Sequence, residues 1–380
     1  MYTNEQHELI RQSVRDFAEQ EVLPLARELD KKEQFSYDLT KKIGELGLFG
    51  MMIPEKYGGQ GMDYLSYIIA VEELARVDSS QAATLAAHNS LGIGPLYSFG
   101  TEEQKEKYLP QLCTGKALWA FGLTEAEAGS DSRGTKTMAT LEGGQWKING
   151  SKIFITNGAT DITIGVTVQA VTGENDGKKE YSTIIVEGDN PGFEAMVMHD
   201  KLCWRASNTS QLFFDNCQVP ESNLLGERGQ GSKIMLQTLD GGRLSIGAMG
   251  LGLAQGAYEM AIRYAKEREQ FGKPLTQFQA ISFKLADMAT KIELARNLLY
   301  KACWLKDNQK PFGKEAAMAK LYCSEIAKEV ADDAVQIHGG YGLMGEYDVE
   351  RFYRDQRILQ IGEGTSEIQR LVISRYILNE

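Results

Sequence analysis

The sequence has few of the residues from which disulfide frameworks and metal sites are built. Five cysteines are scattered through 380 residues without a CxxC pair, and only four histidines occur, none at a spacing typical of metal ligands. These absences argue against a disulfide-stapled secreted domain and against a zinc site. We therefore expect a reduced, intracellular protein whose chemistry needs no metal ion.

Long apolar runs and an excess of basic residues are also missing. The apolar stretches are too short or too interrupted to span a bilayer, and the chain begins without the features of a signal peptide. The formal net charge is −11, whereas nucleic acid requires a basic face. We expect a cytoplasmic protein that inserts into no membrane and binds no nucleic acid.

Length and periodicity predict three domains, because 380 residues exceed what one hydrophobic core usually covers. Residues 1–118 have the apolar spacing of helices. Residues 119–227 alternate, as in Ile162–Val168, and predict an antiparallel β-domain in which Asn149-Gly150 forms a hairpin turn. Residues 228–380 return to helical spacing and predict a four-helix bundle. The expected fold class is α+β, in the order helical domain, β-domain, bundle.

A glycine-rich run at Gly250–Gly256 raises the question of a dinucleotide-binding fingerprint. Its spacing is not G-x-G-x-x-G, and no strand precedes it within a βαβ unit. We expect these glycines to allow close packing of one helix against another.

Glu363 is the strongest candidate for a general base. It stands between Gly362 and Gly364, at a break between two helical segments, where the backbone has freedom to take up positive φ and to approach a ligand closely. The alternative is an ordinary loop acid beside a helix N-terminus, where the macrodipole favours negative charge. The residues alone leave both interpretations open.

Three further stretches combine small residues with groups that bind anions or polar rings. Phe121–Asp131 offers hydroxyls and backbone amides to a planar ligand or a phosphate, or is a plain inter-domain loop. Arg268 in an interhelical loop suits a pyrophosphate, or is solvated. Gln336–Gly342 ends a helix with a glycine cap, and its His338 is expected to be structural.

Together with further motifs along the chain, these stretches indicate a family. Over essentially its whole length the chain resembles the acyl-CoA dehydrogenase family of flavoenzymes. The motifs that carry the resemblance stand in order at Pro54–Gly61 (P-x-x-Y-G-G-x-G), Leu123–Asp131 (L-T-E-x-x-x-G-S-D), Phe154–Gly158 (F-I-T-N-G), Asp240–Arg243 (D-G-G-R), Arg268–Lys273 (R-x-Q-F-G-K), Gln336–Gly342 (Q-I-H-G-G-Y-G) and Glu363–Arg370 (E-G-T-S-E-I-Q-R).

The resemblance implies FAD as cofactor. The residues expected to line the flavin ring are Phe121, Leu123, Thr124, Gly129, Ser130, Phe154, Ile155 and Thr156. Relatives often carry Trp where this chain has Phe154, and the aromatic ring is kept. The pyrophosphate would be held by Arg268, Phe271 and Gln279, with Gln336, Gly339 and Gly340 reaching it from a neighbouring subunit, and Thr365 and Glu367 would touch the adenosine part.

The resemblance also implies an acyl-CoA substrate and gives Glu363 the role of catalytic base. The expected substrate contacts are Ser130, Asp240, Arg243, Gly364 and Arg375. Some branched- and long-chain relatives carry the base at the position of Gly242, where this chain offers no carboxylate. Short-chain relatives often have Tyr before the catalytic Glu, and here the residue is Gly362, so we expect a wider acyl pocket.

The leading hypothesis is therefore an FAD-dependent short- to medium-chain acyl-CoA dehydrogenase. It would work as a homotetramer and pass electrons to an electron-transfer flavoprotein. The alternatives are a glutaryl-CoA-type or branched-chain dehydrogenase and, in a different class, a non-catalytic acyl-CoA- or flavin-binding protein. Against the glutaryl-CoA type, no arginine lies between Gln81 and His88 to read a distal carboxylate. Fatty-acid β-oxidation, amino-acid breakdown and an anaerobic reductive pathway all remain open.

Overall fold

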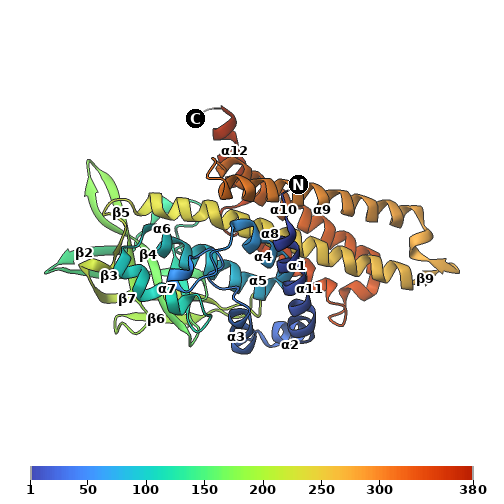
Figure 1. Ribbon diagram of the computed structural model, residues 1–380, viewed down its shortest axis with the longest axis horizontal. Coiled ribbons are helices and arrows are strands. Elements are labelled where there is room, and N and C mark those ends of the chain that lie inside the picture. Colours follow the sequence, from blue (N-terminus) through green and yellow to red (C-terminus); the bar gives the residue numbers. More distant parts are fainter. Residues whose placement is uncertain (1, 379–380) are drawn as a thin grey trace.

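The computed structural model describes residues 2–378, and helices form its N-terminal part (Figure 1). These helices are α1 Glu5–Phe17, α2 Leu23–Lys32, α3 Tyr37–Glu45, α4 Tyr64–Ala75, α5 Ser79–Ala86, α6 Gly94–Phe99 and α7 Glu102–Leu112. Helix α4 is buried along its whole length, because its neighbours cover every face of it rather than one stripe. It is the central helix of this part of the chain.

The β-domain follows, at the left of Figure 1. Its strands are β1 Leu118–Gly122, β2 Met138–Glu142, β3 Gln145–Thr156, β4 Thr163–Asn175, β5 Lys178–Glu187, β6 Phe193–Val197, β7 Thr209–Pro220 and β8 Leu224–Leu225. They pair in the order β6-β7-β3-β2-β4-β5-β8, with β1 added beside β4. The pairing is antiparallel except for β1–β4 and β2–β4, which are parallel and differ in this respect from the expected antiparallel sheet.

The hairpin turn predicted at Asn149-Gly150 is wrong. Strand β3 runs straight through these residues, with Gly150 at φ 147° and an irregular register against β7. The turn lies instead at Gly143 and Gly144, which both have positive φ and join β2 to β3. Both dipeptides suit a turn, and pairing with β7 decided between them.

The C-terminal part is a helical bundle. Its helices are α8 Gly231–Glu267, α9 Gln279–Asp307, α10 Gly313–His338, α11 Val349–Leu359 and α12 Ser366–Leu378. The short strands β9 Glu269–Gln270 and β10 Lys273–Pro274 form a hairpin at the tip between α8 and α9, at the opposite end of the long axis from the sheet (Figure 1). The predicted α+β architecture of helices, sheet and bundle is confirmed.

The glycines of α8 allow it to pack closely against α4. A Cβ atom at Gly252 would lie 2.1 Å from the Glu72 carbonyl oxygen, and one at Gly256 would lie 2.1 Å from that of Arg76. Such distances are far inside van der Waals contact, so only glycine fits. The packing role predicted for Gly250–Gly256 is confirmed.

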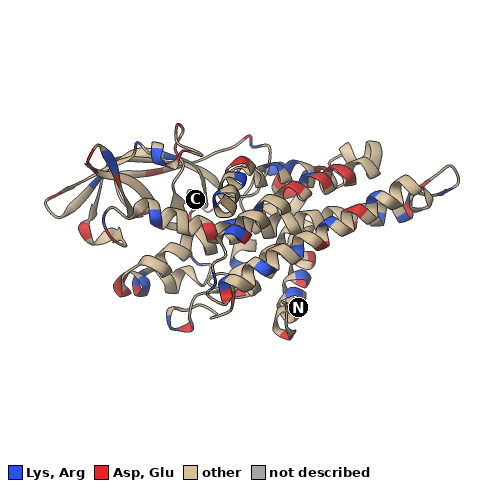
Figure 2. Ribbon diagram, turned by 90° about the horizontal axis from the view of Figure 1, so that it is seen from above, with Lys and Arg blue, Asp and Glu red and all other residues tan. Residues whose placement is uncertain are grey.

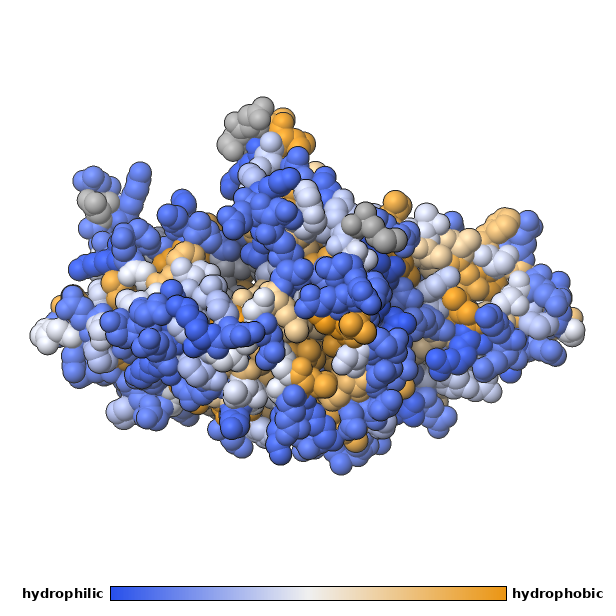
Figure 3. Space-filling view, in the orientation of Figure 1, coloured by the Kyte–Doolittle hydropathy of each residue, from blue (hydrophilic) through white to orange (hydrophobic). Residues whose placement is uncertain are grey.

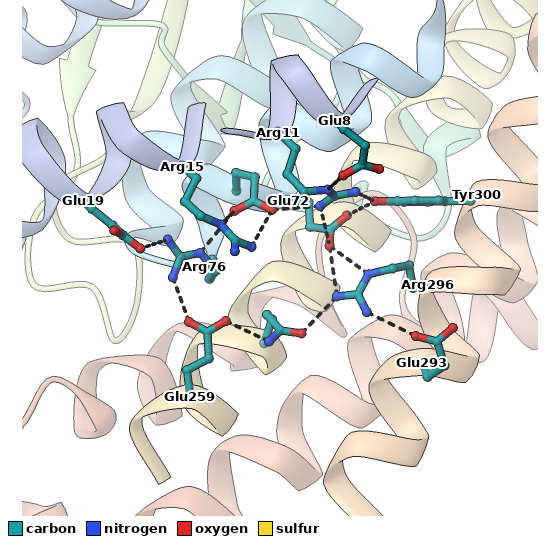
Figure 4. Close-up of polar contacts among 12 residues, drawn as sticks. Glu8, Arg11, Arg15, Glu19, Glu72, Arg76, Glu259, Glu293, Arg296 and Tyr300 are labelled. Carbon is teal, nitrogen blue, oxygen red and sulfur yellow. Dashed lines mark hydrogen bonds and ion pairs between the residues drawn. The ribbon is translucent and has the colours of Figure 1, made fainter. Parts of the chain in front are cut away.

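A buried ionic network, which we call the α1–α4 network, fixes the N-terminal helices to the bundle (Figure 4). Glu73 accepts hydrogen bonds from Arg11 (2.8 Å) and Arg15 (2.9 Å), while Tyr300 donates to Glu72 (2.6 Å). The side chains of Arg76, Glu259, Gln255 and Arg296 complete it. The network connects α1, α4, α8 and α9 through charges that are almost all paired.

Candidate active site

The active-site candidate Glu363 lies in the loop between α11 and α12. Glu363 itself has φ 52° and Gly364 has φ 95°, so two consecutive residues adopt positive φ. A Cβ atom at Gly364 would also lie 2.6 Å from the side-chain nitrogen of Gln369, so glycine is strongly favoured there. A non-glycine residue such as Glu363 is strained in this region, and such strain is frequent at functional sites.

The Glu363 carboxylate points into the protein towards α8. Its Oε2 atom is buried and finds no hydrogen-bond partner among residues 2–378. Burial raises the pKa of Glu363 to about 7, and the positive charges of Lys320 and Arg243 only partly oppose this rise. A carboxyl with such a pKa is close to half-ionised at neutral pH and is a much stronger base than an exposed glutamate.

Gly242 on α8 makes room for this carboxylate. A Cβ atom at Gly242 would lie 1.8 Å from Glu363 Oε2, so a larger residue there would displace the carboxylate. The glycine position and the Glu363 carboxylate are therefore complementary in shape.

Further polar side chains surround the Glu363 carboxylate. Arg243 forms an ion pair with Asp240, but its Nε atom is buried without a partner in the described part of the chain. Tyr64 donates a hydrogen bond to the Gly241 carbonyl oxygen (2.8 Å), and Tyr67 shares one with a serine of α8 (2.9 Å). The structure thus brings the predicted residues Asp240 and Arg243 to the same region as Glu363.

The residues predicted to line a flavin lie at two adjoining loops of the β-domain. Phe121 is buried on β1, and Leu123 and Thr124 follow where the strand ends. The Thr124 carbonyl oxygen accepts a hydrogen bond from the backbone N–H of Ile153 (2.9 Å), which joins this loop to the β3 segment Phe154–Thr156. Gly129 and Ser130 are exposed further along the loop.

Phe154 has the features expected of a ring that covers a flat ligand. Its side chain is 62 % exposed and its φ is 61°, whereas the neighbouring Ile155 is buried. An exposed aromatic ring on a residue with strained backbone, in a segment joined to Thr124 through the backbone of Ile153, fits the flavin ring that the resemblance implies.

The predicted pyrophosphate residues lie at the other end of the molecule. Arg268 and the exposed Phe271 (94 %) belong to the β9–β10 tip, and the Arg268 guanidinium lies 5.6 Å from the ring centroid of Tyr341. That contact places Arg268 beside the Gln336–Gly340 segment of the same chain. Figure 1 and Figure 2 both show this tip far from the sheet that carries Phe154.

The two sets of residues predicted to hold the pyrophosphate lie at the same end of the chain. One set is Arg268, Phe271 and Gln279, and the other is Gln336, Gly339 and Gly340 (Figure 1). Which subunit supplies each set to a bound cofactor stays a prediction. Open space surrounds Gly339 and Gly340, where an added Cβ atom would meet nothing within 4 Å. Arg268, the open glycines and the exposed Phe271 fit the phosphate end of a flavin dinucleotide.

The remaining predicted residues lie at α12. Thr365 accepts a hydrogen bond from the backbone N–H of Ile368 (3.3 Å) at the start of the helix, and Glu367 is exposed beside it. Arg375 is exposed two turns further on, with no contact to Glu363 among those described.

Sequence reasoning missed two buried residues that hold the Glu363 loop. Lys320 on α10 donates a hydrogen bond to the Gly364 carbonyl oxygen (2.7 Å), and Gln369 on α12 donates to the carbonyl oxygens of Glu363 (3.2 Å) and Gly364 (3.0 Å). A signal was available, because Lys320 stands four residues from both Ala316 and Ser324 on a helix face of small residues.

It also missed a buried ion pair behind the flavin loops. Lys152 of β3 contacts Glu125 (2.7 Å) and the Leu123 carbonyl oxygen (3.1 Å). This pair ties the Phe121–Asp131 loop to β3, so it fixes the two segments predicted to line a flavin relative to each other.

Metal sites and membrane-spanning helices are both absent from the described residues. Residues 2–378 contain no cluster of side chains able to hold a metal ion. Their helices also include none that combines the length and apolar character needed to cross a bilayer.

The chain matches family models along nearly its whole length. Residues 4–116 match the acyl-CoA dehydrogenase N-terminal domain, residues 120–217 the middle domain and residues 229–378 the C-terminal domain. It is 51 % identical over 377 residues to the probable acyl-CoA dehydrogenase YngJ of Bacillus subtilis, a match that covers 99 % of this chain and 98 % of the relative.

Solved structures agree with this match. Butyryl-CoA dehydrogenase from Megasphaera elsdenii superposes with a TM-score of 0.96 at 45 % identity, covering 99 % of both chains. A second solved structure comes from a study of the electron transferring flavoprotein of Acidaminococcus fermentans and flavin-based electron bifurcation. It superposes with a TM-score of 0.96 at 46 % identity, and the match covers 100 % of this chain and 99 % of that one.

Proposed function

Because the chain belongs to the acyl-CoA dehydrogenase family, we propose that it converts a short- to medium-chain acyl-CoA to the trans-2-enoyl-CoA, with Glu363 as the base. The chain is an acyl-CoA dehydrogenase, an oxidoreductase whose cofactor is FAD. The observation that carries the proposal is the Glu363 carboxyl, whose Oε2 is buried with no partner among the described residues and whose pKa is raised to about 7.

Glu363 removes a proton from the α-carbon beside the thioester. That C–H bond is a very weak acid, so the base must be strong and shielded from water. Burial supplies both properties, and Gly242 leaves the carboxylate the room it needs. FAD, when bound, supplies the acceptor for the hydride that leaves the β-carbon as the double bond forms.

Polar groups around Glu363 orient the substrate. The unpartnered Arg243 Nε supports a contact to the CoA thioester, with Asp240 holding the guanidinium in place. Ser130, Gly364 and Arg375 remain proposed contacts. Donors aimed at the thioester oxygen stabilise the negative charge that develops as the α-proton leaves.

The cofactor site is completed by a second copy of the chain. The flavin-lining loops and the Arg268–Phe271 tip lie at opposite ends of one molecule, so one copy cannot supply both to one FAD (Figure 1). Figure 3 shows apolar side chains at the surface of the bundle end, and the exposed Phe283, Leu343 and Met344 support an assembly there. We propose a homotetramer in the cytoplasm, with an electron-transfer flavoprotein as electron acceptor.

Gly362 sets the width of the acyl pocket in this proposal. An added Cβ atom there would meet the Ile358 carbonyl oxygen at 3.5 Å, an ordinary contact, so a larger residue is sterically tolerated at its base. Gly362→Tyr should therefore fold and lower the rate for branched or longer acyl groups by about tenfold relative to butyryl-CoA. A chain-length profile identical to that of the wild type would contradict this role.

The test of function is anaerobic bleaching of the flavin absorbance by a panel of straight, branched and glutaryl acyl-CoAs, with the products identified by mass. We expect bleaching by short to medium acyl-CoAs and loss of two hydrogens from the substrate. Preference for glutaryl-CoA would favour the glutaryl-CoA-type alternative. A protein that binds FAD but is bleached by no acyl-CoA would overturn the proposal in favour of a binding protein.

A further inference from the structure

Lys320 is buried in an unusual way. Its side chain is 0 % exposed, and so is that of Lys152, but the two ammonium groups have different partners. Lys152 pairs with the Glu125 carboxylate, whereas the hydrogen bond of Lys320 goes to a backbone carbonyl oxygen, that of Gly364. A buried ammonium ordinarily requires an anion in contact, because desolvation of an unpaired charge costs several kcal/mol.

The anion that faces Lys320 most strongly is Glu363. Burial lowers the pKa of Lys320 to about 8, and the positive charge of Arg243 lowers it further. The negative charge of Glu363 opposes this lowering most strongly, and those of Glu367 and Glu325 oppose it less. Lys320 therefore keeps its positive charge near neutral pH, and the Oε2 atom of the Glu363 carboxylate accepts no hydrogen bond from the part of the chain that the structure describes.

The charged and titratable groups around Glu363 come from three helices. Lys320 lies on α10, Arg243 on α8, and Tyr64 and Tyr67 on α4. Burial raises the pKa of both tyrosines, so they stay neutral. Arg243 forms an ion pair with Asp240. Of the two cations in this set of groups, Lys320 is therefore the one that forms no ion pair within the set.

Lys320 also holds the loop in position. Its bond to Gly364 and those of Gln369 to Glu363 and Gly364 fix two consecutive carbonyl groups. Glu363 and Gly364, which carry these carbonyl groups, have φ values of 52° and 95°. The hydrogen bonds therefore stabilise a positive-φ conformation that the backbone alone disfavours at Glu363.

We propose that Lys320 is a positioning residue for the α-proton abstraction: its hydrogen bond to Gly364 orients the Glu363 loop, and its buried positive charge increases the ionised fraction of the Glu363 carboxylate. This inference rests on the proposed function for its role in the reaction. The hydrogen bond and the charge act on the same loop, but only the charge changes the pH at which Glu363 releases its proton.

The test compares Lys320→Met with Lys320→Arg in the flavin-loaded protein. Methionine keeps most of the side-chain volume without charge or donor, and arginine restores both. The matched control is Lys314→Met, which removes a 40 % exposed lysine from the first turn of the same helix. The first readout is infrared titration of the Glu363 carboxyl, assigned by its absence in Glu363→Gln. The second is the rate of flavin bleaching by butyryl-CoA from pH 6 to pH 9.

We expect Lys320→Met to move the carboxyl midpoint to higher pH and to lower the bleaching rate at pH 6 by about tenfold. The loss should shrink towards pH 9, where the wild-type lysine itself loses its charge. Lys320→Arg should restore the midpoint, and Lys314→Met should match the wild type.

An unchanged midpoint, or a rate that falls by the same factor at every pH, would overturn the proposal. If no acyl-CoA bleached the wild type, the proposed function would fail, yet the infrared titration would still decide whether Lys320 controls the ionisation of Glu363.

Discussion

The α1–α4 network and the loop around Glu363 both bury carboxylates, but their surroundings differ. Glu73 is 1 % exposed and contacts Arg11, Arg15 and Arg76. Burial works to raise its pKa, but the hydrogen bonds and charges of Arg15 and Arg11 outweigh burial and hold the pKa below its usual value. Glu363 Oε2 is buried and has no partner within residues 2–378, and burial raises the pKa of that residue to about 7.

The difference separates stability from chemistry. A carboxylate paired with several arginines is a poor base, because its charged form is already stabilised. A carboxylate that is buried and left unpaired weakens the folded state but accepts a proton readily. We therefore expect opposite effects when each charge is removed.

The largest effect on stability is expected for Glu73→Gln. The change removes a buried anion from three partly buried arginines, of which Arg15 has no other carboxylate partner among the described residues, and should destabilise the protein by about 3 kcal/mol. Denaturant unfolding at pH 8 measures it, with Glu259→Gln as control, a member of the same network that is 31 % exposed and should cost less than about 1 kcal/mol. Equal small losses in both variants would mean that burial does not matter in this network.

The opposite sign is expected for Glu363→Gln. The pKa of Glu363 is about 7 in the folded protein and exceeds the usual value of 4.5. As pH rises, the unfolded chain therefore releases the Glu363 proton before the folded chain does. The contribution of Glu363 to stability consequently falls as pH rises from about 4.5 to 7. The variant should therefore lie within about 1 kcal/mol of the wild type at pH 5 and exceed it by up to about 3 kcal/mol at pH 8. Denaturation midpoints at the two pH values measure this difference, and a variant less stable at pH 8 would remove the contrast with Glu73.

The smallest effect on stability, with a large effect on rate, is expected for Gly242→Ala. The added methyl group would lie 1.8 Å from Glu363 Oε2, the end of a flexible side chain that moves aside. Stability should change by less than about 1 kcal/mol, while displacement of the base lowers the bleaching rate by about 10²-fold. A wild-type rate in this variant would show that the carboxylate reacts from a position other than the one beside Gly242.

Much of the fold could be predicted from periodicity, whereas the candidate site was predicted from motifs and stays a prediction. The alternation at Ile162–Val168 predicted β4, and the two glycines around Glu363 predicted a helix break with positive φ, which the structure confirms. The prediction of a turn at Asn149-Gly150 was wrong because the position of the turn depends on the pairing of β3 with β7, which is a long-range contact.

The partners of buried charges could not be predicted in the same way. Lys320 and Glu73 are ordinary helix residues in the sequence, and only the packing of α10 on the Glu363 loop and of α1 on α4 gives them their environments. Local spacing shows that a charged residue lies on an apolar face, but its partner lies far away along the chain.

The most direct test of Glu363 as the catalytic base is anaerobic reduction of the bound flavin by butyryl-CoA at pH 8, wild type beside Glu363→Gln, with flavin content and stability confirmed in both. We predict a rate at least about 10³-fold lower in a variant that is as stable as the wild type or more so. Bleaching of Glu363→Gln at the wild-type rate would contradict this role, because the carboxylate beside Gly242 would then have no part in the chemistry.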